Sequence, residues 1–386
     1  MVPAMAHLSR RAFLATASTV AATSLAAPRS SWARVASVQA RTRVLIGSSA
    51  PDGILAYDWD PATAELTAVG VAAKVPKVAW LAFSHGHDYV YSASELDTFQ
   101  GKPTGEVASF RLVKGELQPL SGRNSAGVGT CHVAVDQTGR MLIAADYVGG
   151  SAASFRIADG RLSEPVWTEH YTYHGPNADR QKTAHAHFAS FSPDNRFAYI
   201  NDLGGDCIHI YRPDPATAAM KPAGTYHGAP GSGARTLHFH PNGRTAYCMN
   251  ELVSTVDVLA WHKADGSLTL VTRINLLPDG YQGATRGCDT VITRDGRFVY
   301  FANRDDDFLY TFSADAKTGA LTPIARSSCG GKTPRNFVLD PTERWMLVAN
   351  QDSNLLSIFA RDPETGKLAD EGKSVAAEAP MRILFT

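Results

Sequence analysis

Short apolar runs separated by polar turns follow one another along nearly the whole chain. One pattern recurs from about residue 80 to residue 350: an apolar strand, a polar turn, an Arg, a second apolar strand and then an Asp or Asn. A degenerate first copy has Asp88 in the Arg slot. The copies lie about 50 residues apart, with no helical periodicity between them. The repeated residue is Arg140, Arg196, Arg244, Arg297 and Arg344.

Each copy is followed by a third apolar run and a fourth that opens near a Gly-x-Leu triplet, such as Gly319-Ala320-Leu321. Four short strands per repeat are typical of a β-propeller blade. Six copies fit directly. Residues 43–48, residues 54–58 and the region of Leu66 supply strands two to four of a seventh, and residues 380–385 supply its first. We therefore expect an all-β, seven-bladed β-propeller, because closing the ring removes exposed sheet edges. Two stacked β-sandwiches would show no such regular repeat.

The first 40 residues differ from the rest. The motif SRRAFL at residues 9–14 precedes a weakly apolar stretch over residues 15–27, and small-residue cleavage patterns end at Ala27, Ala33 and Ala40. This order predicts a twin-arginine export signal over residues 1–40, with the propeller over 41–386. We expect the twin-arginine export machinery as a partner and a periplasmic location.

Charge and composition exclude several classes of protein. Lys plus Arg and Asp plus Glu number 37 each, but the first 40 residues carry four Arg and no acid, so a processed chain has a net charge of −4. A nucleic-acid partner is therefore not expected. No later segment approaches 18 uninterrupted apolar residues, so no membrane span is expected. The five cysteines are widely spaced without a C-x-x-C pair, which favours small buried strand residues over disulfides or a zinc site.

Counting from the repeated Arg predicts which side chains meet. The first residues of the innermost strand open at one mouth of the channel, and the antiparallel second strand returns to the same mouth. These slots differ from blade to blade, as expected of a site built on a repeated scaffold. The residues predicted to meet are Glu95, His132, His187, Arg235, Glu251, Asp289, Arg304 and Arg335.

These residue types limit the chemistry. Arginines in a partly desolvated channel favour a planar anion, and histidine with carboxylate supplies proton transfer. No G-x-S-x-G, P-loop or G-x-G-x-x-G motif is present, so acyl transfer and dinucleotide chemistry lack support. His185 and His187 form an i, i+2 pair without acidic ligands, so we interpret them as substrate-binding or structural and expect no metal.

Two further features are interpreted as structural. One slot, six residues after the repeated Arg, holds Asp or Asn in five blades, which suggests turn and backbone hydrogen bonding. The repeated Arg is interpreted as a turn or inter-blade residue. An aromatic insertion at residues 170–174 could cover the mouth or pack on the surface. The recurring slot holds Asp146, Asp202, Asn250, Asn303 and Asn350, and the insertion holds His170, Tyr171, Tyr173 and His174.

The segments at residues 183–187, 233–235, 250–252 and 331–337 together resemble the lactonase family of seven-bladed propellers. That family includes 6-phosphogluconolactonases and fungal carboxy-muconate lactonizing enzymes. The resemblance spans residues 42–386, and it implies functional roles for one His, two Arg and one Glu at the mouth. On this chain those are His187, Arg235, Arg335 and Glu251. The chain departs from the family at Thr130-Cys131-His132 and at Asp289-Thr290.

The resemblance implies hydrolysis of a sugar-type lactone without a cofactor. Arg235 and Arg335 would hold an anionic group or the oxyanion, while Glu251 with His187 would position and deprotonate water. Export suggests a lactone other than a cytoplasmic phosphorylated one. Two alternatives remain: lactone formation from an unsaturated diacid, and a non-catalytic propeller that binds a ligand or partner in the envelope. Substrate contacts are expected from Glu95, His132, His185, Asp289 and Arg304.

Overall fold

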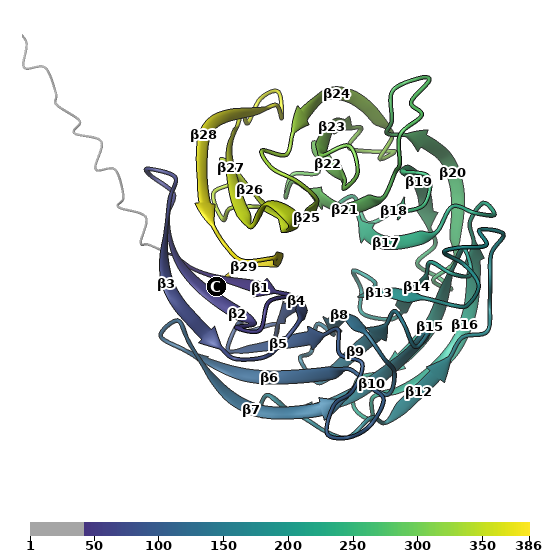
Figure 1. Cartoon of the computed structure of the whole chain (residues 1–386). Helices are drawn as coiled ribbons and strands as arrows, with labels where there is room; N and C mark the ends of the chain where they lie inside the picture. The colour runs from purple at the N-terminus through teal and green to yellow at the C-terminus, as the bar shows by residue number, and fades with distance from the viewer. Residues whose placement is uncertain (1–41) are drawn as a thin grey trace, which may run out of the picture. The chain divides into compact units, whose positions relative to one another are not determined.

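The computed structural model describes residues 42–386, so the proposed export signal lies outside the described residues. This range holds 29 strands and one 3-10 helix, at Gln351–Ser353. The strands form seven antiparallel sheets around a central channel (Figure 1), and the innermost strands of neighbouring sheets contact one another around it. The predicted seven-bladed propeller is thereby confirmed. Within residues 42–386 no helix is long and apolar enough to cross a membrane.

Six sheets consist of strands that are consecutive in the chain. The second sheet holds β4 (Val78–Phe83), β5 (Tyr89–Ser94), β6 (Glu106–Val113) and β7 (Glu116–Asn124). The third holds β8 (Thr130–Val135), β9 (Met141–Asp146), β10 (Ser151–Ala158), β11 (Arg161–Leu162) and β12 (Trp167–His170). The fourth holds β13 (Ala186–Phe191), β14 (Ala198–Asp202), β15 (Cys207–Asp214) and β16 (Ala219–His227).

The other three consecutive sheets keep the four-strand pattern. The fifth holds β17 (Ala234–Phe239), β18 (Thr245–Asn250), β19 (Thr255–Trp261) and β20 (Leu268–Asn275). The sixth holds β21 (Gly287–Ile292), β22 (Phe298–Asn303), β23 (Phe308–Ala314) and β24 (Leu321–Ser328). The seventh holds β25 (Pro334–Leu339), β26 (Trp345–Asn350), β27 (Leu355–Arg361) and β28 (Leu368–Ala376).

The first sheet closes the ring as expected. Its innermost strand is the C-terminal β29 (Pro380–Phe385), which pairs with β1 (Thr42–Ser48) and is followed outward by β2 (Ile54–Asp60) and β3 (Glu65–Ala73). Ile383 lies opposite Ile46, and both are fully buried. The two ends of the described chain are thus held in one hydrogen-bonded sheet.

The third sheet departs from the expected pattern. The Gly-x-Leu triplet of this blade is Gly160-Arg161-Leu162, where the fourth strand is expected to begin. This strand is split into β11, which has two residues, and β12, which pairs with another part of β10. Pro165 lies in the interruption and has no backbone N–H to donate to a neighbouring strand. The chain then leaves the sheet after His170 and forms a long insertion, residues 171–185, before β13.

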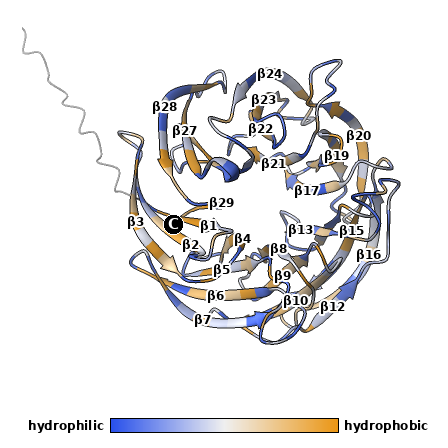
Figure 2. Cartoon of the chain, in the orientation of Figure 1, coloured by the Kyte–Doolittle hydropathy of each residue, from blue (hydrophilic) through white to orange (hydrophobic). Residues whose placement is uncertain are grey.

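Apolar residues of neighbouring sheets pack together, so each core lies between two blades. One core joins Val44 and Trp59 of the first sheet to Leu347 and Ile358 of the seventh. Apolar positions follow the strands, while the loops around the ring are largely polar (Figure 2). All five cysteines are buried and unpaired; four lie in strands and Cys329 directly follows one, close to the expectation.

Repeated hydrogen bonds also cross between blades. The buried Tyr247 hydroxyl donates to the Gly319 carbonyl at 2.7 Å, and Tyr300 donates likewise to Gly366. These glycines open the Gly-x-Leu triplets and have a positive φ, which favours residues without a Cβ. The repeated Arg344 reaches the carbonyl of Pro61 in the next blade at 2.9 Å. The inter-blade role expected for this Arg is confirmed there.

Replacing Ile383 by Ala should destabilise the protein by about 2–4 kcal/mol, because it removes a fully buried side chain from the strand that closes the ring. Urea unfolding followed by tryptophan fluorescence measures this difference. Val271→Ala, at a position 63% exposed, is the control and should change the free energy of unfolding by less than about 0.5 kcal/mol. Equal stabilities for the two variants would contradict a stabilising role for the closing strand.

Candidate functional site

A β-bulge at the start of the innermost strand places side chains at one mouth of the channel. In β13, Ala186 and Phe188 pair with consecutive residues of β14, so His187 is the extra residue. Arg235 and Arg335 occupy the same place in β17 and β25. Bulges turn a side chain away from the regular alternation of a strand. The other bulged residues are Ala79, Cys131, the pair Cys288–Asp289, and Met381.

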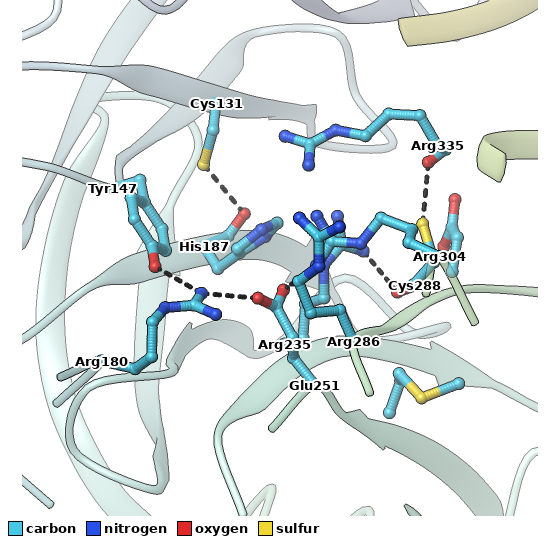
Figure 3. A network of polar contacts seen from close by, with 12 residues as sticks. Cys131, Tyr147, Arg180, His187, Arg235, Glu251, Arg286, Cys288, Arg304 and Arg335 are labelled. Atoms are coloured by element: carbon cyan, nitrogen blue, oxygen red, sulfur yellow. Dashed lines mark hydrogen bonds and ion pairs between the residues drawn. The ribbon is translucent and has the colours of Figure 1, made fainter. Parts of the chain in front are cut away.

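The mouth holds a cavity of about 280 Å³. Five of the residues predicted from the sequence line it, so the predicted convergence is correct for them. Figure 3 shows side chains from several blades gathered around the His187 ring. The predicted lining residues are Glu95, His187, Glu251, Arg304 and Arg335, and the other lining residues are Asp97, Gly129, Tyr147, Val148 and Arg180.

Glu251 is the centre of the polar network. Its carboxylate is 2% exposed and contacts Arg180 at 2.7 Å, Arg235 at 2.9 Å and Arg304 at 2.6 Å. Burial alone would raise the pKa of this carboxyl, but the charges of Arg304 and Arg235 outweigh burial and hold its pKa well below the usual range. A carboxylate of such low basicity is a poor acceptor for a water proton. Three guanidinium groups thus share the Glu251 carboxylate.

Arg180 was not predicted from the sequence. Its guanidinium donates to the Tyr147 hydroxyl at 3.0 Å and to Glu251. The neighbouring Gln181 is fully buried and donates to Leu203 O at 2.9 Å and to Asp206 at 2.7 Å, which anchors the insertion. The insertion lies outside the repeat, so counting from the repeated Arg could not place it. The signal that the sequence did offer was a basic residue, Arg180, shortly before the channel strand that begins at Ala186.

Two arginines of the lining bring positive charge to the cavity. Arg304 is 5% exposed, and its Nε and Nη2 have no hydrogen-bond acceptor, although Nη2 is close to Glu251. Burial and the charges of Arg235 and Arg335 lower the pKa of Arg304 to about 10, so it remains a cation at neutral pH. Arg335 contacts only Glu95, at 3.5 Å, among the charged groups described.

The cavity carries excess positive charge. The lining holds the three guanidinium groups of Arg180, Arg304 and Arg335 and the three carboxylates of Glu95, Asp97 and Glu251. Arg235, which contacts Glu251 at 2.9 Å, adds a fourth guanidinium group beside the cavity. Lys77 lies 3.7 Å from Asp97 and offsets it at the rim. The remaining positive charge favours an anionic ligand or an oxyanion.

His187 is the group best suited to accept a proton. It is 9% exposed, its Nδ1 has no hydrogen-bond partner, and its ring meets Tyr147 edge to face at 5.6 Å. Burial first, and then the charge of Arg235, lower its pKa well below 6.5. The imidazole is therefore neutral at pH 7 and can act as a general base.

Three of the predicted site residues, the expected substrate contacts His132 and Asp289 and the expected catalytic residue Arg235, do not line this cavity. His132 lines a chamber of about 20 Å³ deeper in the channel, where its ring lies between Trp80 and Phe188. Arg235 also lines this chamber while it contacts Glu251. Asp289 accepts hydrogen bonds from Asn336 at 2.9 Å and lies 3.0 Å from His238. Counting residues from the repeated Arg predicted the strand end at which these three residues lie. It did not predict how deep in the channel each side chain lies, because this depends on the bulge.

His185 faces Tyr147 and does not line the cavity. Its Nδ1 lies 2.8 Å from Tyr147 O, and the two rings stack at 4.5 Å. It therefore supports a residue of the cavity wall, which corrects the expected substrate contact. In the insertion, Tyr171 stacks on His209 at 4.0 Å and its hydroxyl lies 3.0 Å from that of Tyr211. Tyr171 therefore packs against β15 of the neighbouring fourth blade and does not line the cavity, which agrees with the second of the two arrangements considered.

Known proteins share this architecture. The family model "Lactonase, 7-bladed beta-propeller" matches residues 43–385. The 6-phosphogluconolactonase of Bacillus subtilis is 32% identical over 299 residues, covering 77% of this chain and 83% of that protein. A 6-phosphogluconolactonase of Formosa agariphila is 31% identical over 304 residues, covering 76% and 84%.

A solved structure, that of the periplasmic gluconolactonase of Pseudomonas aeruginosa, is also similar. It superimposes with a TM-score of 0.83 at 31% sequence identity, covering 90% of this chain and 99% of that one. The match in fold, the extent of the family model and the mouth built from His, Arg and Glu agree. The chain belongs to the lactonase family of seven-bladed β-propellers.

Proposed function

We propose that this protein hydrolyses an aldonolactone at the mouth of the propeller, with His187 as the general base. The observation that carries the proposal is the buried imidazole of His187 in a cavity that the guanidinium groups of Arg180, Arg304 and Arg335 also line. The names of the similar proteins, 6-phosphogluconolactonase and gluconolactonase, support this reaction class.

In the proposed reaction His187 transfers the proton, and Arg304 and Arg335 stabilise the negative charge. Water attacks the lactone carbonyl carbon as His187 takes its proton. The negative charge that develops on the carbonyl oxygen is stabilised by the guanidinium groups of Arg304 and Arg335, which line the cavity. The ring C–O bond then breaks, and the His187 imidazolium returns its proton to the leaving alkoxide. Ring opening gives a carboxylic acid and a hydroxyl group, and the acid then releases its proton to solvent and becomes a carboxylate.

Glu251 has a different part from the one expected. Its low basicity excludes it from taking the water proton, yet it lies against three guanidinium groups. Buried guanidinium groups close together repel one another, and a shared carboxylate offsets this repulsion and fixes their directions. Glu251 is thus a positioning residue in the proposed mechanism.

We also propose that the protein acts outside the cytoplasm. The twin-arginine pattern of residues 1–40 supports export, and the name of the similar Pseudomonas aeruginosa protein includes a periplasmic location. Fractionation of cells that express the full chain tests this, with Arg10→Lys/Arg11→Lys as the variant. Retention of the variant in the cytoplasm, against release of the wild type with the periplasmic fraction, is expected. Equal distribution of both would reject export by this route.

The purified protein should open 6-phosphogluconolactone or gluconolactone faster than buffer does, as measured by acid release with a pH indicator. Arg304→Met should lower kcat/KM by about 100- to 1000-fold, because it removes a donor from the oxyanion. Arg244→Met is the matched control, since Arg244 is an exposed turn residue in the sheet that carries Arg235. A wild-type rate in Arg304→Met would contradict the oxyanion role. Turnover of a muconate-type diacid alone would favour lactone formation instead.

His187→Gln should lower kcat by about 100- to 10,000-fold, because Gln keeps a polar side chain of similar reach but cannot accept a proton from water. Stopped-assay measurement of kcat at saturating lactone checks this, with near-ultraviolet circular dichroism as the control for folding. A folded variant that retains wild-type kcat would remove His187 from the mechanism.

The pH profile of kcat/KM should show a plateau that extends below pH 6.5. A general base works when unprotonated, so a lowered pKa keeps His187 active under acidic conditions in which a free imidazole, of pKa about 6.5, is half protonated. Arg335→Met removes a charge that lowers this pKa, and should move the acidic limb to higher pH. An acidic limb centred at or above pH 6.5 in the wild type would contradict the assignment.

A further inference from the structure

A second group of chemically reactive side chains lies outside the cavity, where β14 turns into β15. Asp202 ends β14 and is paired directly with Cys207, the first residue of β15. His209 follows two residues later, and alternate residues of a strand share one face. All three side chains are buried, with Asp202 and Cys207 inaccessible and His209 6% exposed.

The donor atoms of these residues face one another. His209 Nε2 lies 3.5 Å from Cys207 Sγ and 3.6 Å from Asp202 Oδ2, and all three atoms lie within 4.8 Å of one another. Among residues 42–386 this is the one group of three His, Cys, Asp or Glu residues that meets this spacing.

The same slot in other blades is closed by direct hydrogen bonds. Asn250 Nδ2 donates to Asp257 at 3.0 Å, Asn350 Nδ2 donates to Ser357 at 2.9 Å, and Asp146 accepts from Ser151 at 3.0 Å. The fourth blade substitutes sulfur and imidazole for the oxygen partners of the others. The distance of 3.6 Å between His209 Nε2 and Asp202 Oδ2 is also longer than a hydrogen bond between a ring nitrogen and a carboxylate.

One oxygen of Asp202 has no partner. Oδ1 accepts from the backbone N–H of His185 at 2.8 Å and of Gly205 at 3.1 Å, which confirms the turn role expected for this slot. Oδ2 is fully buried and accepts no hydrogen bond. A buried carboxylate oxygen without a partner is costly and requires a physical explanation.

A cation between the three donors would supply the missing partner. Zinc lies about 2.3 Å from sulfur and about 2.0–2.2 Å from nitrogen or oxygen, so tetrahedral ligands stand about 3.3–3.6 Å apart. The separations from His209 Nε2 fall in or next to this range. A set of one sulfur, one nitrogen and one oxygen suits zinc, whereas calcium and magnesium require oxygen ligands.

We propose that Asp202, Cys207 and His209 form a structural binding site for Zn²⁺. Cys207 binds as the thiolate, and its proton passes to solvent. Tyr171 stacks on the His209 ring at 4.0 Å and the Tyr173 ring lies 5.4 Å from it, so the insertion covers the imidazole.

The site also bears on the mouth of the channel. Asp202 holds the backbone of His185, two residues before His187, through Oδ1. The insertion that covers His209 continues to Arg180. A cation fixed to Asp202 and His209 therefore secures the chain segments that carry both groups, independently of whether the cavity hydrolyses a lactone.

Cobalt substitution tests the proposal with a readout separate from activity. The purified protein, stripped with a chelator and dialysed, should bind one equivalent of Co²⁺ with a near-ultraviolet thiolate-to-metal absorption band, and Zn²⁺ should displace it and raise the Tm. The band should vanish in Cys207→Ser. Cys248→Ser, at a buried cysteine of the neighbouring sheet, is the matched control and should keep it.

His209→Gln should weaken Zn²⁺ binding by about 100-fold or more in calorimetric titration, since even outer partners of metal ligands contribute about 10- to 100-fold. If this variant does not fold, the wild type alone decides: absence of both the cobalt band and the zinc-induced rise in Tm overturns the proposal. A band that persists in Cys207→Ser, or disappears equally in Cys248→Ser, overturns it as well.

Discussion

No sheet of this propeller can bury its apolar surface by itself, and closure of the ring is the constraint on which the rest of the structure depends. Every core lies between neighbouring blades, and the core between the first and seventh blades joins the two ends of the described chain. Because β29 completes the first sheet, this core requires strands from both ends of the described chain. The closed ring then holds seven strand starts at fixed positions around one channel (Figure 1).

That rigid frame makes a concentrated group of charges possible. Glu251, Arg235 and Arg304 are nearly inaccessible to water, where isolated charges would be strongly unfavourable. Each comes from a different strand or loop, so their separations are set by the ring and not by local flexibility. The same guanidinium charges, together with burial, keep His187 neutral. The arginine charges thus have two effects: they lower the pKa of His187, and they attract anions to the cavity.

The insertion after the third sheet adds a second layer to this arrangement. Gln181 ties it to the fourth blade, and Arg180 extends from it to Tyr147 and Glu251. A segment outside the repeat therefore completes the wall of the cavity. Its aromatic residues pack beside His209, so the two ends of one insertion connect the cavity with the Asp202 cluster.

The sequence by itself determined the seven-bladed architecture, the closing strand and the mouth at which His187, Glu251, Arg304 and Arg335 meet. It could do so because strand alternation and a repeat of about 50 residues are local properties that each blade expresses independently. Only the tertiary structure decided how deep each side chain lies, since the bulges break the alternation from which depth would be inferred. It also decided the direction in which the pKa of Glu251 shifts, because this depends on arginines from distant parts of the chain that the ring brings to it.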